Sequence, residues 1–391
     1  MFGFGGRAAP ARVATDCVVP VGFFDNTIIF RTLVLYTLFA FDDVLDPYRL
    51  RTSLARVVAQ PGWNKLGARV RRNTSGDLDH HIFLSYSEER PAIGYDHLDL
   101  GDGNLEDHPA ASHIPKPSHD SHSTVVSDPD KLVDLYSSPG IPKGLDDYIY
   151  SDRPELGLRV VSFKNKTIVV LHWIHRMLLQ RPVKRMYLSS PRATCCWPGR
   201  VIQAMTASLS RDSETTIAVQ QAYQFRPVLK DLNPVGRPFL SNCVSFLVSL
   251  MPAKDVTLKP LSHLASSIRH LIKEQGIREQ VEAYTSLVRE DPANHAPPFF
   301  GESGMQLIMF SNWSKSNLFA TDLSAAAAKS RSEPLCSSYL QSVQGPCNFN
   351  DGIIVVGKDM QGNHWLSGYR AWGLWGLMEE EIARQRTQLM V

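Results

Sequence analysis

Residues 160–180 carry the stretch that decides the fold, and they read Val-Val-Ser-Phe-Lys-Asn-Lys-Thr-Ile-Val-Val-Leu-His-Trp-Ile-His-Arg-Met-Leu-Leu-Gln. Within it, residues 167–171 form an apolar, mainly β-branched run that follows a turn signal at Asn165-Lys166. This pattern predicts a strand that is buried on both faces. The predicted strand leads into two histidines, His172 and His175.

The two histidines are candidates for acid–base chemistry. A neutral imidazole accepts a proton near pH 7, and the end of a buried strand can present it to a cleft. Side chains alternate along a strand, so residues three apart point to opposite faces. We therefore expect only one of His172 and His175 to face a given cleft. The alternative is that both are ordinary core histidines.

Length and composition predict a globular protein of two domains. The chain has 391 residues, 43% of them hydrophobic and 20% charged, with a net charge of +2. At roughly 150 residues per domain this length suits two domains, or three. The small charge favours neither a nucleic-acid nor a membrane partner. The cysteines show no Cys-x-x-Cys pair and no zinc-type spacing, so we expect reduced thiols and no metal.

No segment has the pattern of a signal peptide or a transmembrane helix. The first ten residues lack a basic start followed by an apolar core. The most apolar segment, residues 27–41, is interrupted by Arg31 and is too short to span a bilayer. We therefore expect a cytoplasmic protein without a membrane partner, working as a monomer.

Strand and helix signals occur in both halves of the chain. Residues 32–41 predict a strand, and Asp46-Pro47 predicts a following helix with Asp46 as N-cap. Similar signals predict strands at 67–72, 81–85 and 305–313, a helical segment at 261–289 interrupted at Gly276, a hairpin at 351–365 and a final helix at 378–388. We predict two α/β domains, at 1–215 and 216–391.

Two segments depart from this regular pattern. Residues 101–130 are rich in His, Ser, Pro and Asp, which predicts a long exposed loop, and their histidines are too irregularly spaced for a metal site. Between Glu155 and Asp212 there is no acidic residue, and residues 180–200 follow no regular period. This segment is a nucleic-acid patch, an unusual surface loop or a piece foreign to the parent fold. The absence of regularly interleaved aromatic residues disfavours nucleic acid.

Four separated motifs carry a family resemblance. They are Asp46-Pro47-Tyr48-Arg49-Leu50 with Gly62-Trp63-Asn64-Lys65-Leu66-Gly67-Ala68-Arg69, then Val169-Val170-Leu171-His172-Trp173-Ile174-His175, then Phe239-Leu240-Ser241-Asn242-Cys243, and finally Phe310-Ser311-Asn312-Trp313 followed by Asp322-Leu323-Ser324. Over most of the chain these motifs resemble the BAHD acyltransferases, specifically the fungal branch related to trichothecene acetyltransferases. The resemblance implies two chloramphenicol-acetyltransferase-like α/β domains with the active-site channel between them.

The resemblance also implies a reaction. An acyl group moves from an acyl-CoA, with acetyl-CoA as the expected co-substrate, to a hydroxyl of a small fungal natural product such as a terpenoid or polyketide. His175 best matches the family's catalytic histidine and is implied as general base, with His172 as the alternative. Ser311 and the Trp313 indole are the implied donors to the oxyanion.

Two further residues have implied roles. Asn242 lies in the segment that resembles the lining of the acyl-transfer channel, which makes it a substrate-binding residue together with Ser311 and Trp313. Asp322 matches the first residue of the family's Asp-Phe-Gly-Trp-Gly motif and is implied as a structural anchor held by an arginine. The rest of that motif is Leu-Ser-Ala-Ala here.

The resemblance fails at the His-x-x-x-Asp motif. Four residues after His175 stands Leu179, and four after His172 stands Arg176, so neither register supplies the aspartate. We hypothesise that residues 176–211 are out-of-frame or mis-spliced sequence, with part of the motif and its following helix lost. Residues 180–200 should then be poorly packed, because they lack an apolar period. Two functions stay open: an active acyltransferase, and a catalytically impaired BAHD-like protein.

Overall fold

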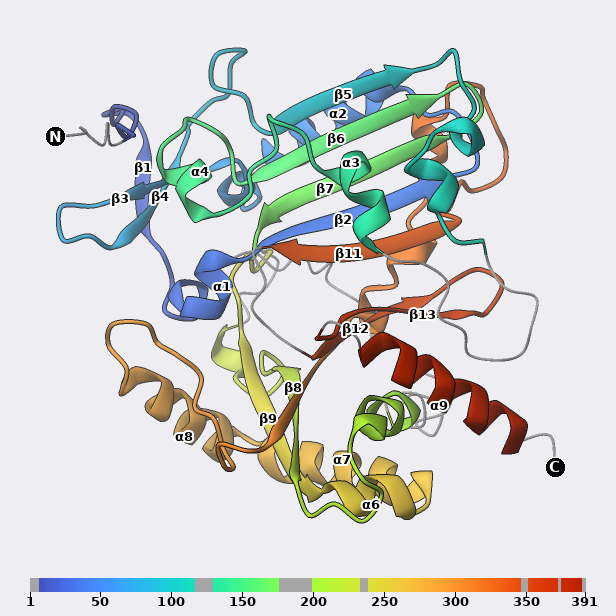
Figure 1. The fold of residues 1–391 in the computed structure, drawn as a ribbon. Helices are drawn as coiled ribbons and strands as arrows, with labels where there is room; N and C mark the ends of the chain where they lie inside the picture. The colour runs from blue at the N-terminus through green and yellow to red at the C-terminus, as the bar shows by residue number, and fades with distance from the viewer. Residues whose placement is uncertain are drawn as a thin grey trace, which may run out of the picture.

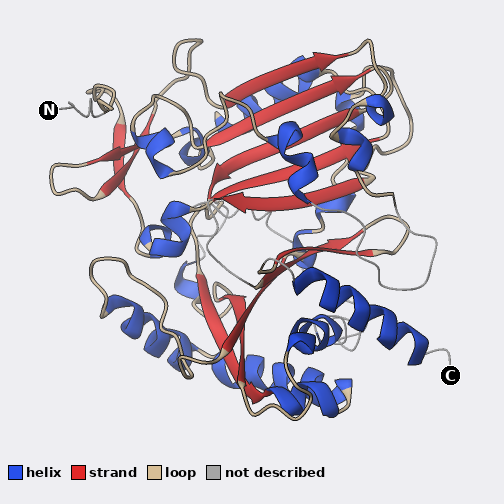
Figure 2. Cartoon of the chain, viewed as in Figure 1, coloured by secondary structure: helices blue, strands red, loops and turns tan. Residues whose placement is uncertain are grey.

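Two five-stranded sheets and a small three-stranded sheet make up the β-structure of the residues that the computed structural model describes. These residues are 7–116, 129–175, 199–232, 238–345, 351–371 and 374–388. In Figure 1 the first five-stranded sheet lies above the second, and helices pack on both. Figure 2 shows the same view with the strands in red and the helices in blue.

The first sheet is built around its central strands. In spatial order its members are β11 (Tyr339–Gly345), β2 (Val34–Phe41), β7 (Thr167–Ile174), β6 (Leu156–Phe163) and β5 (Gly94–Leu100). Neighbouring strands are antiparallel except β5 and β6, which are parallel. All of β2 and β6 is buried, as is β7 apart from Leu171. The strand predicted at 167–171 is confirmed, because a β-branched apolar run suits a sheet covered on both faces.

One strand of this sheet and one helix that follows it in the chain were also predicted. The strand predicted at 32–41 begins at Val34, because residues before it form the short helix α1 (Ile28–Thr32). The helix predicted after Asp46 is α2 (Pro47–Val58), and the Asp46 carboxylate accepts hydrogen bonds from the backbone N–H groups of Tyr48 and Arg49. Two short helices, α3 (Val133–Tyr136) and α4 (Leu145–Ile149), follow later in the chain.

The second sheet lies in the other half of the molecule. Its strands, in spatial order, are β13 (His364–Tyr369), β12 (Gly352–Lys358), β10 (Gln306–Asn312), β8 (Thr216–Gln224) and β9 (Val244–Pro252). Strand β10 is parallel to both neighbours, and β12 pairs antiparallel with β13. The predicted strand at 305–313 and the predicted hairpin at 351–365 are therefore confirmed.

Helices pack against the second sheet. They are α6 (Ala253–Leu258), α7 (Leu261–Gln275), α8 (Arg278–Arg289) and α9 (Leu374–Gln388), and Figure 1 shows α6 and α7 at its lower end. Ile217 and Ile308 of the sheet are buried with Leu264 and Ile268 of α7 in one apolar cluster. The helical segment predicted at 261–289 is confirmed as two helices, and its break falls at Gly276 as expected.

The small sheet has the order β1 (Cys17–Pro20), β4 (Leu78–Ile82) and β3 (Arg69–Arg72). The strand predicted at 81–85 lies a few residues earlier, as β4. A turn decides this register, because the Asn73 side chain accepts hydrogen bonds from the backbone N–H groups of Ser75 and Asp77. Strand β4 starts directly after that turn and pairs with β3.

One strand does not follow the expected division at residue 215. Strand β11 comes from the second half of the chain but pairs with β2 along its whole length, Tyr339 opposite Ala40 and Gly345 opposite Val34. The first apolar core also contains Leu340, Ile354 and other residues from that half. Strand β11 therefore belongs to the first sheet although it lies after residue 215. The predicted domain ranges, 1–215 and 216–391, otherwise stay a prediction.

Both unusual segments differ from expectation where the structure describes them. The region predicted as an exposed loop at 101–130 buries Leu105 and Ala111, which join the first core, while residues 117–128 lie outside the described residues. Residues 199–205 are helical and bury Ile202 and Met205 in the second core. This packing counts against the hypothesis of foreign sequence for this stretch. Residues 176–198 lie outside the described residues.

Candidate functional site

His175 follows directly after β7. Its backbone N–H donates a hydrogen bond to the carbonyl of Leu33 (2.8 Å). Its ring stacks on Phe30 of α1 with 4.8 Å between ring centroids and 25° between planes, and among the described residues its Nδ1 has no hydrogen-bond partner. Burial disfavours the imidazolium and lowers the pKa of His175 to about 4. The ring is neutral at pH 7 and can accept a proton.

His172 lies in the core, as the alternation along β7 predicted. Its ring packs against Tyr36 and directly against the backbone of Gly157, where an added Cβ would stand 2.0 Å from the His172 Cε1. Burial, with smaller contributions from Arg153 and Arg159, lowers the pKa of His172 to about 3. This histidine is a neutral core residue, and its contacts place it away from His175.

Asn242 joins the second half of the chain to His175. Its Nδ2 donates a hydrogen bond to the backbone carbonyl of His175 (2.8 Å), and its backbone N–H donates to Asp25 Oδ1 (2.7 Å). The residue is buried, and its Oδ1 has no partner among the described residues. Asn242 and His175, both singled out from the sequence, therefore lie together. Their roles in binding and catalysis stay predictions.

Two charged residues next to Asn242 were given no role in the sequence analysis. Asp25, whose side chain is fully buried, forms an ion pair with Lys65 (3.2 Å between Oδ2 and Nζ). Lys65 Nζ also donates to Ser241 Oγ (2.7 Å). The available signal was a single carboxylate in the apolar segment that precedes β2, because an isolated charge in such a segment needs a buried partner. Its partner is 40 residues away in sequence and cannot be predicted locally.

Ser311 and Trp313 lie together at the end of β10. The Trp313 indole N–H donates to Ser311 Oγ (2.9 Å), and the Trp313 backbone N–H donates to the carbonyl of Val355 (2.9 Å). In this arrangement the indole N–H is bonded to Ser311, and the hydroxyl hydrogen of Ser311 remains to donate. The expected role of both side chains as donors to an oxyanion stays a prediction. No hydrogen bond or ring contact between described residues links this pair to His175.

Asp322 is bonded to the backbone of its own loop. One carboxylate oxygen accepts hydrogen bonds from the backbone N–H groups of Ser324 and Leu335, both 2.8 Å long, and these bonds lower the pKa of Asp322. No arginine among the described residues forms a hydrogen bond or ion pair with it. Arg331 instead pairs with Asp43 (2.7 Å) and lowers the pKa of Asp322 only through its charge. The backbone of its own loop holds Asp322.

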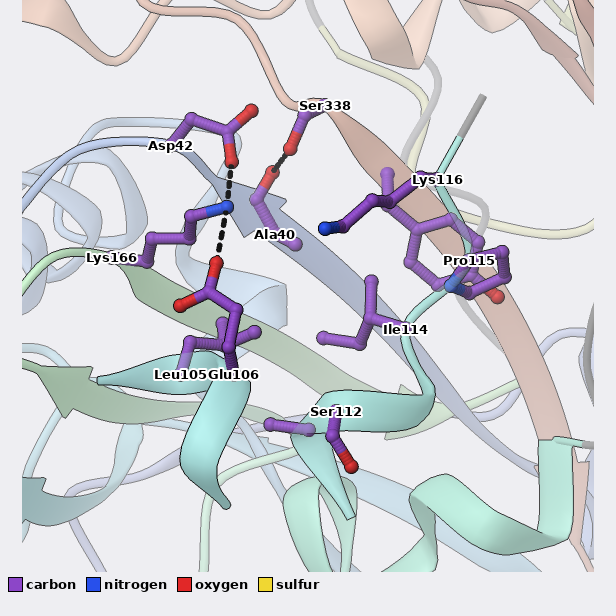
Figure 3. Close-up of a pocket in the computed structure, with 12 residues that line it drawn as sticks. Ala40, Asp42, Leu105, Glu106, Ser112, Ile114, Pro115, Lys116, Lys166 and Ser338 are labelled. Atoms are coloured by element: carbon purple, nitrogen blue, oxygen red, sulfur yellow. Dashed lines mark hydrogen bonds and ion pairs between the residues drawn. The ribbon is translucent and has the colours of Figure 1, made fainter. Parts of the chain in front are cut away.

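Two well-formed cavities in the described part of the chain lie away from His175. One, of about 210 Å³, is lined by Ala40, Ile114, Lys166, Tyr339 and others, and Figure 3 shows Lys166 between Asp42 and Glu106 at its edge. In the β2–β7 register, Val34 and Ile174 mark the His175 end, whereas Phe41 and Thr167 mark the cavity end. The second cavity, of about 400 Å³, is lined by Arg49, Arg331 and the 324–330 loop.

Within the described ranges, no three His, Cys, Asp or Glu side chains gather in a way that could hold a metal ion. No helix in these ranges is long and apolar enough to cross a membrane.

Comparison with known sequences finds no matching family model, but it finds full-length relatives. "Transcriptional regulator calD" of Penicillium decumbens is 30% identical, over 97% of this chain and 98% of that protein. "Acetyltransferase adrJ" of Penicillium roqueforti is 24% identical over 95% of this chain and 97% of that protein. The first alignment spans 486 positions, but 97% of 391 residues is about 380, so roughly 100 of its positions have no residue of this chain.

Comparison with solved structures confirms the predicted fold. The crystal structure of F. sporotrichioides TRI101 complexed with Coenzyme A and T-2 has a TM-score of 0.60 and 11% sequence identity. The match covers 95% of this chain and 98% of that one. The architecture is thus the mixed α/β arrangement of two chloramphenicol-acetyltransferase-like domains. That solved neighbour holds CoA and a small-molecule acceptor.

Proposed function

The chain belongs to the fungal, trichothecene-acetyltransferase-like branch of the BAHD acyltransferases, and on that premise we propose that it is an acyl-CoA-dependent O-acyltransferase. The proposed reaction transfers an acyl group, with acetyl as the expected one, to a hydroxyl of a small fungal natural product such as a terpenoid or polyketide. We further propose that the protein works in the cytoplasm as a monomer.

The observation that carries this proposal is the placement of His175. The ring is neutral and stacked on Phe30, the backbone is held by Leu33 and Asn242, and the strand behind it is buried. A general base contributes about 10²–10⁴-fold when it stands within hydrogen-bond reach of the proton that it accepts. The described contacts support this role because the imidazole is uncharged at pH 7 and its backbone is held in place. Burial also makes the ring a weaker base than a free imidazole, because a general base works best with a pKa near the operating pH.

The proposed steps balance without a further reagent. His175 accepts the proton of the acceptor hydroxyl, and the hydroxyl oxygen forms a bond to the thioester carbonyl carbon. The carbonyl electron pair moves onto oxygen, and the hydroxyl hydrogen of Ser311 is the candidate donor to that oxyanion. Collapse of the intermediate breaks the carbon–sulfur bond, and the CoA thiolate takes the proton from the imidazolium. Ester and free CoA are the products.

A second candidate function is a BAHD-like protein that keeps the fold but has lost turnover. Leu179 stands where the family motif has aspartate, and among the described residues no carboxylate contacts the His175 ring. One full-length relative is named a transcriptional regulator rather than an acyltransferase. An impaired enzyme would explain both observations.

The test is CoA release from acetyl-CoA by purified protein in the presence of a panel of hydroxylated terpenoids and polyketides. We expect measurable CoA release by the unmodified chain and none by His175→Ala. His172→Ala should lower stability but leave the turnover per folded molecule unchanged. Release that His175→Ala does not affect contradicts the proposed site. No release by this chain, but release after a His-x-x-x-Asp segment is restored at 175–179, supports the impaired alternative. No release in either case refutes the proposed activity.

The foreign-sequence hypothesis for residues 176–198 has its own test. Transcript reads compared with the coding DNA should reveal a retained or skipped piece near codon 176. Transcripts that encode the segment as written, and no others, would show that it is genuine.

A further inference from the structure

Four residues form a polar cluster that contacts His175 through Asn242, and we call it the Asp25 cluster: Asp25 and Asn242, which are buried, and Lys65 and Ser241, which are partly buried. We propose that its ion pair, Asp25–Lys65, is a positioning pair for His175 that acts through Asn242. It holds the backbone carbonyl of the histidine and so determines where the ring stands. This inference rests on the proposed role of His175 as the base.

The cluster joins separate parts of the chain. Asp25 lies in the turn before α1, Lys65 lies between α2 and β3, and Ser241-Asn242 precede β9 in the second half. The Asp25 carboxylate accepts from the Asn242 N–H (2.7 Å) through one oxygen and faces Lys65 (3.2 Å) through the other. The Asn242 side chain then donates to the His175 carbonyl (2.8 Å). A continuous chain of contacts therefore runs from the ion pair to the histidine.

Burial makes this ion pair hard to explain by stability alone. The Asp25 side chain is 0% exposed and that of Lys65 is 17% exposed. Removing two charges from water costs free energy that a buried pair often fails to recover, and apolar replacements are often equally stable. A pair of this kind is best attested where it determines one specific arrangement. Here that arrangement is the position of the 241–242 backbone against His175.

The same turn also positions the ring. Helix α1 starts three residues after Asp25 and carries Phe30, on which the His175 ring stacks (4.8 Å). Fixing Asp25 therefore fixes both the carbonyl contact and the stacking partner of His175. Among the described residues no carboxylate bonds to this ring. The backbone hydrogen bond from Asn242 and the stacking on Phe30 therefore hold the ring in position. A displacement of about 1 Å can lower a rate by about 10²-fold.

The experiment compares Asp25→Asn and Lys65→Met with a matched control, Asp351→Asn. Asp351 forms a buried pair with Arg370 (2.9 Å; side chains 6% and 1% exposed), and Arg370 also donates to the backbone carbonyl of Met205, a residue of the second core. The first measurement is the NMR titration of the His175 ring, assigned with His175→Gln, which needs no activity. The second is kcat and KM for acetyl-CoA, corrected for the folded fraction.

We expect the wild-type His175 signal to stay constant above pH 5.5, in keeping with a pKa of about 4. In Asp25→Asn and Lys65→Met the pKa of His175 should move toward 6.5, because the released ring contacts water. Both substitutions should also lower kcat at least tenfold, while KM changes less than threefold. The double variant should lose less than the sum of the two, since it leaves no unpaired buried charge. Asp351→Asn should lower stability without either effect.

Three outcomes overturn the inference. One is an unchanged His175 titration in both Asp25→Asn and Lys65→Met. Another is an equal loss of kcat in Asp351→Asn, which would reduce the pair to a structural role. The third is full additivity in the double variant. Should Asp25→Asn fail to fold, Lys65→Met decides alone, because its side chain is partly exposed. A wild-type chain without turnover, but with the expected His175 titrations, would refute the proposed function and leave the positioning pair standing.

Discussion

Acidification should destabilise this protein through His172, which is buried, and through His175, which is partly buried, and His172 allows the effect to be measured. In the folded state burial holds the pKa of His172 near 3, whereas an unfolded histidine titrates near 6.5. As the pH falls through 6.5, His172 binds a proton in the unfolded chain but stays neutral in the folded chain. The free energy of unfolding therefore decreases with falling pH, from about pH 6.5 down to about pH 3.

The size of the effect follows from the two pKa values. At pH 5 the unfolded state gains about 2 kcal/mol from protonating His172, and at pH 7 it gains only about 0.2 kcal/mol. The folded pKa of His175, about 4, predicts a similar loss. Together the two histidines should remove about 4 kcal/mol between pH 7 and pH 5, a large share of the stability of an ordinary domain.

Urea unfolding at pH 7, 6 and 5 is the assay, with His172→Asn as the perturbation. Asparagine does not titrate, so the variant should lose about 2 kcal/mol less than wild type over this pH interval, whatever its stability at pH 7. His270→Asn is the control, because His270 is 72% exposed on α7. If wild type and His172→Asn show the same pH dependence, His172 is not a neutral core residue and the placement of β7 is refuted.

Three further predictions test local features. Gly157→Ala should lower the free energy of unfolding in urea by about 1–3 kcal/mol or more, because the new Cβ collides with the His172 ring. Adding His172→Ala should reduce this cost. Additive effects of the two substitutions would contradict the contact. Asp46→Ala should cost about 1 kcal/mol in thermal unfolding by removing the N-cap of α2, and no change would rule out the cap. Asp322→Ala should speed hydrogen exchange of the Leu335 amide, whose acceptor it removes, while exchange in β7 stays unchanged.

The elements that were predicted correctly are those with a local signal. The β-branched run before His172 is buried on both faces, as such runs are in covered sheets. Asp46 caps α2 because Asp followed by Pro satisfies and pre-organises the first helical turn. The alternation of side chains along β7 sufficed to separate His172 from His175. Each of these outcomes depends on neighbours in sequence, so the sequence alone determined them.

Tertiary structure decided what depends on residues distant in sequence. Nothing local indicates that β11 leaves the second half of the chain to pair with β2, since strand pairing is set by the global topology. The Asp25–Lys65 pair and its link through Asn242 to His175 bring together segments from both halves. The hydrogen bond from the Trp313 indole N–H to Ser311 is a side-chain contact at a strand end that no sequence pattern indicates. The sequence supplied the residue types of the site, and only the packed fold determined which of them share hydrogen bonds, because a buried polar group takes whichever partner the tertiary structure places within reach.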